Sequence, residues 1–420
     1  MSPVTSPGVY PAASSVSDGR LSIGGCDAVA LAREFGTPAF VVAEDSLRAR
    51  AREFRSALAE HHDGPGAILF AAKAFSCTPV LRVFAEEGLS CLVSTGGELH
   101  LALRAGFAPA DIQLHGNAKA TSELEAALAA GVGTIVVDSF DDLERLERLV
   151  PADRPQRVLL RVMPGVETDT HAKIATGHAD AKFGLGLDRA AEALERINRN
   201  PALAAAGLHM HLGSQLFDYE PFRVGVAALR TLGDLEVYDL GGGLGVPYTD
   251  EDPTPSVSDY VAAKARALRE LAGPGKTLLI EPGRALSASA CVTLYTVQTV
   301  KETAARTWVA VDGGMSDNLR PTLYGARYDV RVADRMDDDG RLVTVVGKHC
   351  ETGDELRRDI SLPDPRPGDV LVTPVTGAYG YSLANNYNGV PRPPVVFCSD
   401  GDARVVVRRE TYDDLVARDV

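Results

Sequence analysis

The stretch Ala67–Cys77 reads AILFAAKAFSC, and it is the first strand-like segment of a repeating pattern that indicates the fold. Six apolar residues, 67–72, precede Lys73, and Ala74 and Phe75 follow it. A short apolar run of this kind is typical of a buried strand. Most lysines lie on solvated faces, and the apolar neighbours of Lys73 set it apart from those. The pattern predicts a buried strand that ends in a lysine.

From this strand onward, short apolar runs alternate with longer Ala-, Leu-, Glu- and Arg-rich runs that have helical spacing. The strand-like runs are 67–72, 89–93, 112–116, 134–138, 158–163, 207–212, 236–240 and 277–281. Strict alternation predicts parallel strands with helices packed outside them. Eight repeats is the number that closes a (β/α)8 barrel, and an open, doubly wound sheet is the alternative.

After residue 285 the pattern changes to alternating strands separated by Gly, Pro and Asp turns. We therefore expect an α/β protein with a barrel over residues 38–285 and an all-β domain over residues 286–420. Residues 1–37 are expected to begin as a flexible tail of about twenty residues and then to join the β domain.

Composition narrows the class of protein. The 420 residues are 45% hydrophobic and 24% charged, with a net charge of −14 and no block of basic residues, so we expect no nucleic-acid partner. No apolar run approaches the roughly 18 residues that span a membrane, and the N-terminal stretch lacks the pattern of a secretion signal. The six cysteines form no CxxC pair, which indicates reduced thiols and a cytoplasmic protein. His209 and His211 share a strand face but lack a third ligand, so no metal site is predicted.

The residues that follow the predicted strands point to one kind of chemistry, because barrel enzymes carry their chemistry at the C-terminal strand ends. Lys73 follows the first strand, and a lysine there can form a Schiff base. The segment DLGGGLG, residues 239–245, follows the seventh strand, and its glycines allow backbone N–H groups to approach an anion. Ser214 can add a hydroxyl, and Glu281 can keep a pyridine nitrogen protonated. Together these features predict a site for pyridoxal 5′-phosphate (PLP).

Each feature also has a simpler interpretation. The glycine segment can be only a turn, and Lys73 can be a salt-bridged residue on the rim of the barrel. Glu281 can be an ion-pair partner of Arg284, and His211 can be a core histidine. Their agreement in order and in position at strand ends favours the cofactor site.

Several motifs resemble the fold-type III, barrel-type PLP-dependent decarboxylases over roughly residues 35–400. They are FAAKAF (70–75), STGGEL (94–99), HGNAK (115–119), HxxIxTG with KFG (171–184), HMHLGSQ (209–215), GGGLG (241–245), EPGR (281–284), VDGGMSDNLRPTLYGARY (311–328), CETGD (350–354) and GAYGYS (377–382). The resemblance implies the alanine-racemase-like architecture, a barrel followed by a β domain.

The resemblance also implies a role for each matching residue. Lys73 corresponds to the Schiff-base lysine and His211 to the histidine that stacks on the cofactor ring. Glu281 corresponds to the partner of the pyridine nitrogen. Phosphate contacts are implied for Ser214, Gly241, Gly242, Gly243, Arg284 and Tyr379.

The substrate is implied by a second group of residues. Arg320 and Tyr324 correspond to residues that hold a substrate carboxylate, a role to which Arg284 and Tyr379 also contribute. Cys350 and Glu351 correspond to a pair that reaches into a partner subunit's site, the cysteine as proton donor and the glutamate as the ligand of a distal amino group. The plain alternative for Cys350 is a buried structural thiol. A homodimer with shared active sites is therefore expected.

An arginine together with a glutamate suits a distal carbon that bears both a carboxylate and an ammonium. The expected reaction is decarboxylation of meso-2,6-diaminopimelate to L-lysine and CO2. Leu92 departs from the family pattern, because an aspartate is common at its position. The alternatives are decarboxylation of another carboxylated amino acid in specialised metabolism, a PLP-dependent racemase, and a non-catalytic homologue.

Overall fold

The computed structural model describes residues 2–3, 8–166, 182–337 and 340–420. The motif HxxIxTG lies outside these described residues, although Lys182–Gly184 of the same segment lie within them.

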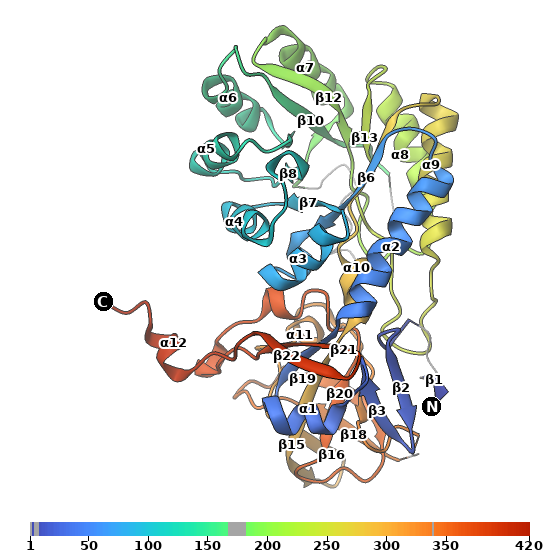
Figure 1. Ribbon diagram of the computed structural model, residues 1–420, viewed down its shortest axis with the longest axis vertical. Helices are drawn as coiled ribbons and strands as arrows, with labels where there is room; N and C mark the ends of the chain where they lie inside the picture. Colours follow the sequence, from blue (N-terminus) through green and yellow to red (C-terminus); the bar gives the residue numbers. More distant parts are fainter. Residues whose placement is uncertain (1, 4–7, 167–181, 338–339) are drawn as a thin grey trace. The chain divides into compact units, whose positions relative to one another are not determined.

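The chain forms two compact units, which are described separately (Figure 1). The barrel unit comprises Arg50–Gly245 and Pro255–Ala285. The β unit comprises Met1–Ala49, Val246–Thr254 and Leu286–Val420.

The barrel unit contains the eight predicted strands as one closed parallel barrel. Each strand pairs in parallel with its neighbours, and pairing of β9 with β10 and of β14 with β6 closes the ring. The strands are β6 (Gly66–Ala71), β7 (Ser90–Val93), β8 (Ile112–Leu114), β9 (Thr134–Val137), β10 (Gln156–Met163), β12 (Leu203–His209), β13 (Val237–Asp239) and β14 (Thr277–Ile280). A two-residue strand, β11 (Leu185–Gly186), extends the end of β10. The (β/α)8 prediction is confirmed, and the open sheet is excluded.

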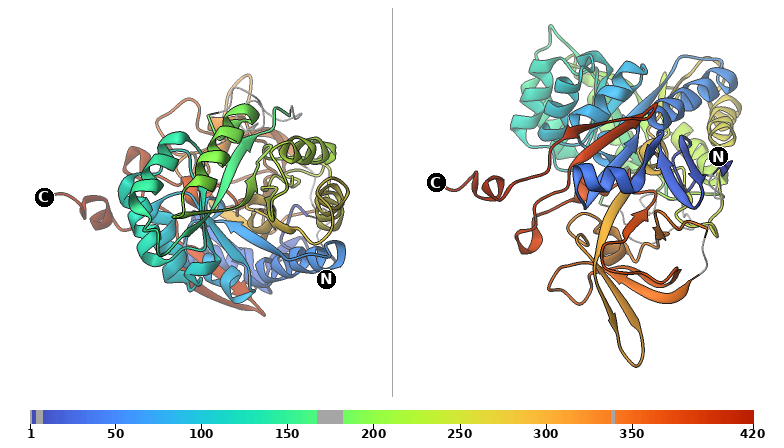
Figure 2. Two further views of the ribbon diagram at one scale, coloured as in Figure 1. Left: turned by 90° about the horizontal axis from the view of Figure 1, so that it is seen from above. Right: turned by 60° about the horizontal axis from the view of Figure 1, so that its bottom comes forward.

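Helices surround this ring of strands (Figure 2). They are α2 (Glu44–His61), which begins in the β unit, α3 (Thr78–Glu86), α4 (Gly96–Ala105), α5 (Thr121–Ala130), α6 (Phe140–Leu149), α7 (Leu187–Arg199), α8 (Glu220–Arg230) and α9 (Val257–Ala272). Several begin at a hydroxyl cap. Thr95 accepts the N–H of Glu98 at α4, and Ser139 accepts that of Asp142 at α6. Such caps satisfy backbone donors that a helix leaves open at its N-terminus.

The interior of the barrel has an apolar part and a polar part. Two buried apolar clusters meet at Leu279, which packs against both. They consist of Val136, Leu159, Ala206 and Val237, and of Leu69, Ala71 and Leu92. Other inward-facing positions carry polar side chains, which form the site described below. A filled interior of this kind is normal for an eight-stranded barrel.

The β unit is built on a nine-stranded sheet. The order along its main path is β19-β18-β16-β15-β5-β21-β22, and β20 pairs with both β15 and β17. The strands are β5 (Ala39–Ala43), β15 (Cys291–Glu302), β16 (Thr307–Val311), β17 (Arg331–Val332), β18 (Arg341–Val346), β19 (Glu355–Leu362), β20 (Val370–Thr373), β21 (Val395–Ser399) and β22 (Asp402–Val407). Buried Val, Leu and Tyr side chains of these strands form its core. Three short helices, α1 (Ala28–Phe35), α11 (Arg320–Tyr324) and α12 (Tyr412–Val416), complete the unit.

The N-terminal region differs from the expectation of a tail. Strands β2 (Ser14–Ser17) and β3 (Arg20–Ile23) form an antiparallel hairpin, flanked by β1 (Ser2–Pro3) and β4 (Cys26–Asp27). The turn residues Asp18 and Gly19 have φ values of 51° and 72°. An Asp-Gly pair suits a two-residue hairpin turn, because such turns need positive φ at both positions.

The unit boundaries also differ from the expected ones. Strand β5 belongs to the β unit because it pairs with β15 and β21, and residues 44–49 follow it there. Residues 246–254 join the same unit, where the O atom of Tyr248 accepts the N–H of Asp329.

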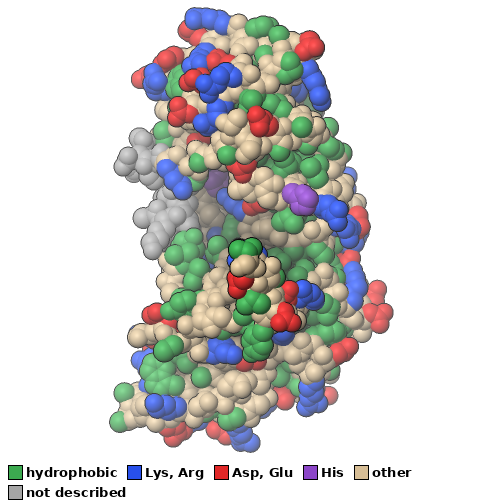
Figure 3. Space-filling model, turned by 90° about the vertical axis from the view of Figure 1, so that its left-hand side faces the viewer, with side chains coloured by type: hydrophobic (Ala, Val, Ile, Leu, Met, Phe, Trp, Pro, Cys, Tyr) green, Lys and Arg blue, Asp and Glu red, His purple; other side chains and the backbone are tan. Residues whose placement is uncertain are grey.

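The distribution of surface charge and the character of the helices bear on whether nucleic acid or a membrane is a partner. Basic and acidic side chains are interspersed on the face drawn in Figure 3. Among the described residues, no helix combines the length and the apolar character that crossing a membrane requires.

Candidate active site

Lys73 lies just beyond the first barrel strand. Strand β6 ends at Ala71, and a 3-10 turn, η1 (Ala72–Ala74), carries the lysine. Ala72 and Ala74 are each 1% exposed, whereas the Lys73 side chain is exposed. The segment is therefore anchored by its alanines and presents a primary amine, although the apolar neighbours of Lys73 had set it apart from lysines on solvated faces.

The EPGR turn after β14 fixes this segment from the side. The N–H of Ala71 donates to the O atom of Pro282 over 3.3 Å. A Cβ at Gly283 would lie 3.1 Å from the Cβ of Ala74 and 3.2 Å from that of Ala71. Glycine at this position thus allows the ends of β14 and β6 to pack closely.

The Lys73 ammonium faces several titratable groups of the barrel. It lowers the pKa of Glu98, although burial of that carboxyl has the larger, raising effect. It also lowers the pKa of His211 and of Glu281. In both cases burial has the larger effect, which lowers the pKa of His211 and raises that of Glu281. Glu98 is held in place by the N–H of Ser94, which donates to its Oε2 over 2.7 Å. The lysine therefore lies within the electrostatic reach of the residues with which it was predicted to act.

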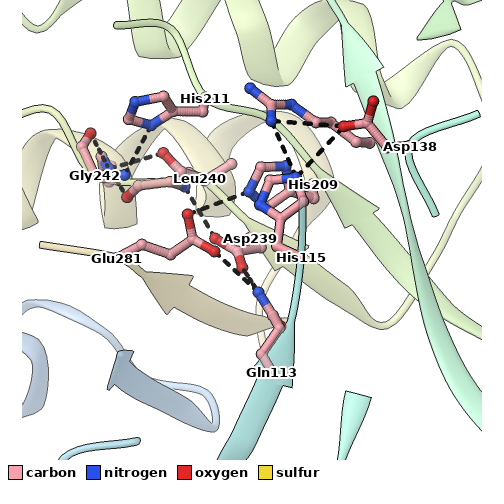
Figure 4. Close-up of polar contacts among 12 residues, drawn as sticks. Gln113, His115, Asp138, His209, His211, Asp239, Leu240, Gly242 and Glu281 are labelled. Atoms are coloured by element: carbon pink, nitrogen blue, oxygen red, sulfur yellow. Dashed lines mark hydrogen bonds and ion pairs between the residues drawn. The ribbon is translucent and has the colours of Figure 1, made fainter. Parts of the chain in front are cut away.

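Glu281 lies at the centre of a buried hydrogen-bond network (Figure 4). Gln113 Nε2 donates to Glu281 Oε1 over 2.9 Å and to Asp239 Oδ2 over 2.7 Å. His209 Nε2 lies 3.2 Å from Glu281 Oε2. Side chains of two strands, β8 and β12, thus fix the two carboxylate oxygens of Glu281, which directly follows β14.

The two carboxyl groups of this network are coupled. Burial and the charge of Glu281 raise the pKa of Asp239 to about 7, and a hydrogen bond to Glu281 adds to the rise. Burial also raises the pKa of Glu281, whereas the bond from Asp239 lowers it. Asp239 is therefore the member that carries the proton, and Glu281 is the ionised one. An ionised Glu281 is what a protonated ring nitrogen requires.

A second group of charges lies behind this pair. Arg161 Nη1 is 3.0 Å from His115 Nε2 and 3.6 Å from Asp138 Oδ1. The His115 and His209 rings are in contact, with centroids 4.4 Å apart. Burial lowers the pKa of His209 to about 4 and lowers that of His115 well below its ordinary value, so both rings are neutral.

His115, His209 and Glu281 have the donor atoms of a metal site, all within 4.8 Å of one another. A hydrogen-bond network explains their arrangement better. His209 Nε2 already faces Glu281, and the Arg161 guanidinium lies beside His115, where it would repel a metal cation. We assign no metal to them.

The glycine segment after β13 forms a tight turn that only glycine permits. Gly241 and Gly243 have φ values of 62° and 111°. A Cβ at Gly242 would lie 2.3 Å from the O atom of Glu281, and one at Gly243 would lie 2.7 Å from the O atom of Gly213. The N–H of Gly242 donates to Nδ1 of His211 over 3.2 Å, which orients the ring of that half-buried histidine.

Ser214 and Arg284 complete this part of the site. Arg284 Nη2 donates to Ser214 Oγ over 3.0 Å, and Arg284 opens the short helix α10 (Arg284–Ser287). A hydroxyl, a guanidinium and a glycine turn are donors suited to a phosphate. The simple ion pair of Arg284 with Glu281 is not what the structure shows, because Glu281 is bonded to Gln113 and His209 instead.

These residues fit PLP. Lys73 offers an exposed amine, Glu281 an ionised carboxylate, and the glycine turn has no Cβ that would obstruct close approach of an anion. All of them lie in the barrel unit.

The remaining predicted residues lie in the β unit. Arg320 is buried beneath the rings of Tyr248 and Tyr328, and its Nη1 donates to the Tyr328 hydroxyl over 2.5 Å. Tyr324 ends the same helix, α11, and is half-buried. Tyr379 is half-buried with φ at 62° and lies within the electrostatic reach of Arg320.

Cys350 and Glu351 lie on the loop between β18 and β19. Both are exposed, and Cys350 is the exposed one among six free cysteines, the other five being buried. The interpretation of Cys350 as a buried structural thiol is therefore wrong. Thr322 Oγ1 donates to the O atom of Gly353 over 2.9 Å, which joins this loop to α11.

Leu92 lies in the apolar part of the barrel. It is 6% exposed and packs with Leu69 and Ala71, next to the strand end that leads to Lys73. A leucine is thus accommodated by its neighbours, whereas an aspartate would be buried among apolar side chains.

Sequence reasoning missed several residues of the site. They are Glu98, Gln113, His115, Asp138, Arg161, His209 as a neighbour of Glu281, and Asp239. Most are polar side chains within apolar strands rather than after them. That pattern is the signal that could have found them, because a polar residue in a buried strand needs a partner inside the barrel.

The barrel, its lysine and its glycine turn define the class of a barrel-type PLP-dependent enzyme. The family model described as "Pyridoxal-dependent decarboxylase, pyridoxal binding domain" matches residues 44–288. The chain is a PLP-dependent amino-acid decarboxylase.

The comparisons with individual proteins are more specific. The chain is 47% identical over 437 residues to diaminopimelate decarboxylase of Actinosynnema pretiosum subsp. auranticum, covering 100% of this chain and 97% of the relative. It is 42% identical over 422 residues to that of Bacillus subtilis (strain 168), covering 96% and 95%. The structure of diaminopimelate decarboxylase from M. jannaschii in complex with L-lysine superimposes with a TM-score of 0.91 at 32% identity, covering 97% of each chain. The chain therefore belongs to the diaminopimelate decarboxylase family.

Proposed function

We propose that the protein removes CO2 from meso-2,6-diaminopimelate and releases L-lysine. The observation that carries this proposal is the match along nearly the whole chain to diaminopimelate decarboxylases, one of them solved with L-lysine. The presence of both Arg320 and Glu351 agrees with a substrate whose distal carbon bears a carboxylate and an ammonium.

The barrel unit prepares the cofactor. When bound, PLP takes up the electron pair that remains when CO2 leaves an amino acid. Lys73 supplies the amine that a cofactor aldehyde requires. Ionised Glu281 would accept a hydrogen bond from a protonated ring nitrogen, and His211 would cover the ring and exclude water from it. Gly241–Gly243, Ser214 and Arg284 of the barrel unit offer donors to the phosphate, a role that the family resemblance also gives to Tyr379 of the β unit.

The β unit supplies the groups that act on the substrate. The exposed Cys350 thiol gives its proton to the carbon that has lost CO2. The planar guanidinium of Arg320 and the Tyr324 hydroxyl hold the distal carboxylate, whereas Glu351 accepts hydrogen bonds from the distal ammonium. Arg284 serves the phosphate and a substrate carboxylate.

We further propose that the protein is a cytoplasmic homodimer in which Cys350 and Glu351 of one subunit serve the site of the other. Mixing Lys73→Ala with Cys350→Ala subunits then creates one intact site in each mixed dimer, and up to about a quarter of the activity returns. Mixed dimers that form without regaining activity would contradict shared sites.

The direct experiment offers the purified protein with PLP five amino acids side by side and measures CO2 and the amine product. The substrates are meso-diaminopimelate, L-ornithine, L-arginine, L-lysine and L-glutamate. We expect turnover of diaminopimelate alone, with lysine as the product. Turnover of ornithine or arginine in its place would overturn the substrate assignment, and racemised substrate without CO2 would overturn the reaction.

A further inference from the structure

Lys264 is a fully buried lysine in the barrel unit that the proposed chemistry does not use. It lies in α9 with 0% of its surface exposed, and no carboxylate of the described residues forms an ion pair with it. Its Nζ donates to three backbone carbonyls, those of Leu240 at 2.8 Å, Gly241 at 2.7 Å and Gly242 at 3.4 Å. Burial of an amine is unfavourable, so a buried lysine that bonds three carbonyls and no carboxylate indicates a specific structural or functional role.

Two aromatic rings complete the surroundings of this amine. Lys264 Nζ lies 4.2 Å from the ring centroid of Phe222, on α8, and 4.4 Å from that of Tyr260, one helical turn before it. Burial lowers the pKa of Lys264, and this effect exceeds the opposing effect of the nearby acidic groups, Asp239 and Glu281. The two shorter carbonyl bonds need two N–H donors, which lysine has even as a neutral amine, and the third bond needs the third N–H of the ammonium.

The three carbonyls belong to the glycine turn after β13. In a trans peptide the C=O and the following N–H point in opposite directions. With its carbonyls directed at Lys264, the turn therefore directs its N–H groups to the other side. The N–H of Gly241 donates to Asp239 Oδ1 over 3.0 Å, and that of Gly242 donates to His211 Nδ1 over 3.2 Å (Figure 4). By the same geometry, the N–H of Gly243 points away from Lys264.

A run of three glycines does not hold this orientation alone. Glycine adopts positive and negative φ with similar ease, so the peptide planes of such a turn can flip at little cost. A flip at Gly242 would direct a carbonyl oxygen toward the side where an anion is expected. The bond from Lys264 to the Gly242 carbonyl opposes such a flip, because the flip would leave the buried amine without one of its three acceptors.

We propose that Lys264 is a positioning residue for the cofactor phosphate: it holds the carbonyls of residues 240–242, and thereby the peptide plane through which the turn presents the N–H of Gly243 to that anion. The N–H groups of Gly241 and Gly242 are already bonded to Asp239 and His211. The inference rests on the proposed placement of the phosphate at this turn. It predicts that Lys264 contributes to the affinity for the phosphate of PLP and contributes little to the affinity for the pyridine ring and the aldehyde.

The test compares binding of PLP with binding of pyridoxal, which lacks the phosphate, to the purified apoenzyme by absorbance titration. Lys264→Met keeps the length of the side chain and removes its donors. We expect the dissociation constant for PLP to rise about tenfold, and that for pyridoxal to change by less than about twofold. Equal weakening of both ligands, or of neither, would overturn the inference and leave Lys264 a purely structural residue.

Lys119→Met is the matched control. Lys119 is also a buried lysine of the barrel unit, but it pairs with Asp142 and with the O atom of Gly116 instead of the glycine turn. Its loss should lower the thermal stability of the apoenzyme without changing the ratio of the two dissociation constants. A change in this ratio as large as that in Lys264→Met would show that any buried lysine has the same effect, which contradicts the proposal.

Phe222→Leu tests the inference if Lys264→Met does not fold. It removes one ring that encloses the amine, and we expect a smaller change of the ratio in the same direction. An unchanged ratio in this folded variant would count against the proposal. If the unmodified protein binds pyridoxal as tightly as PLP, the placement of the phosphate itself fails, and this outcome is distinct from failure of the role of Lys264.

Discussion

The Glu281 network and the Cys350 loop hold their functional side chains in different ways. Glu281 is buried in the barrel, and side chains from separate strands bond each of its oxygens. Cys350 and Glu351 are exposed; the backbone around them is fixed, and the Glu351 carboxylate accepts a hydrogen bond from the exposed Tyr387 hydroxyl.

Asp354 is the anchor of that loop. Its Oδ2 accepts the N–H of His349 over 2.9 Å, and its Oδ1 accepts the N–H of Met315 over 2.7 Å. A group that tunes a cofactor needs a fixed environment, whereas groups that meet a substrate need access. The two regions should therefore respond differently to substitution. Substitutions in the barrel should change the absorbance of the cofactor and the pH dependence, whereas substitutions in the loop should change kcat and KM.

Lys73→Ala should have the largest effect, because no other described residue offers an amine at this strand end. Activity should fall on the order of a thousandfold or more, and the absorbance band of the bound cofactor should be lost. Lys73→Arg is the control, since it keeps a cation but cannot replace the amine. Retention of the absorbance band in either variant would show that another residue bonds the cofactor.

Glu281→Gln should reduce kcat on the order of a hundredfold, because an amide cannot balance the charge of a protonated ring nitrogen. PLP should still bind, since Lys73 and the phosphate donors remain. Absorbance spectra across pH would report the protonation of the ring. A spectrum and a kcat that both match the unmodified protein would remove Glu281 from the mechanism.

Cys350→Ala should also reduce kcat, by on the order of 10²-fold, but without a change in thermal stability or in the PLP spectrum. The side chain is exposed, so its removal leaves no cavity. Cys291→Ala is the structural counterpart, because that buried thiol should cost stability instead. If Cys350→Ala loses stability but keeps its kcat, the proton-donor assignment is wrong.

Asp239 makes the stability of the barrel depend on pH. Its pKa is about 7 in the folded chain against an ordinary value of 3.8, so the carboxyl takes up a proton on folding over this range. The folded state is therefore favoured at low pH within this window and loses stability as pH rises from about 4 to about 7, by on the order of 2–4 kcal/mol. Asp239→Asn mimics the protonated form and should flatten the pH dependence of the urea midpoint of the apoenzyme. An unchanged slope would mean that Asp239 is ionised in the folded chain.

The sequence was most informative where a functional residue directly follows a strand. The eight strands were predicted because buried parallel strands are continuous apolar runs, and Lys73, Glu281 and the glycine turn follow three of them. Gln113, Arg161 and Asp239 were missed because they lie within strands, and only the closed barrel brings them together. Lys264 was missed for a similar reason. It lies on the apolar face of α9 with Tyr260 and Leu268, where a helical pattern gives no sign that a lysine has backbone partners.

The hairpin at residues 14–23 was missed although its turn was visible. Asp18-Gly19 is a hairpin signal, but the Ser- and Pro-rich surroundings indicated a tail. The boundary between the two units differs from the expected one for a different reason. β5 directly precedes α2, the first helix around the barrel, yet it pairs with β15 and β21, and such long-range pairing is not encoded in the local pattern.

Tyr387→Phe should have the smallest effect and sharpens the comparison most. The Tyr387 hydroxyl donates to Glu351 Oε2 over 3.3 Å, and the ring stacks on His349 with centroids 5.9 Å apart. Removing the hydroxyl leaves the ring and the backbone in place, so only the orientation of the Glu351 carboxylate is released. Because both side chains are exposed, the lost hydrogen bond is weak, and we expect the KM for diaminopimelate to rise by only about two- to fivefold at an unchanged kcat. Glu351→Gln should raise KM further, and in that background Tyr387→Phe should add little, because the hydroxyl acts through the carboxylate. Full additivity of the two changes, or a lower kcat in Tyr387→Phe, would show that Tyr387 contacts the substrate itself.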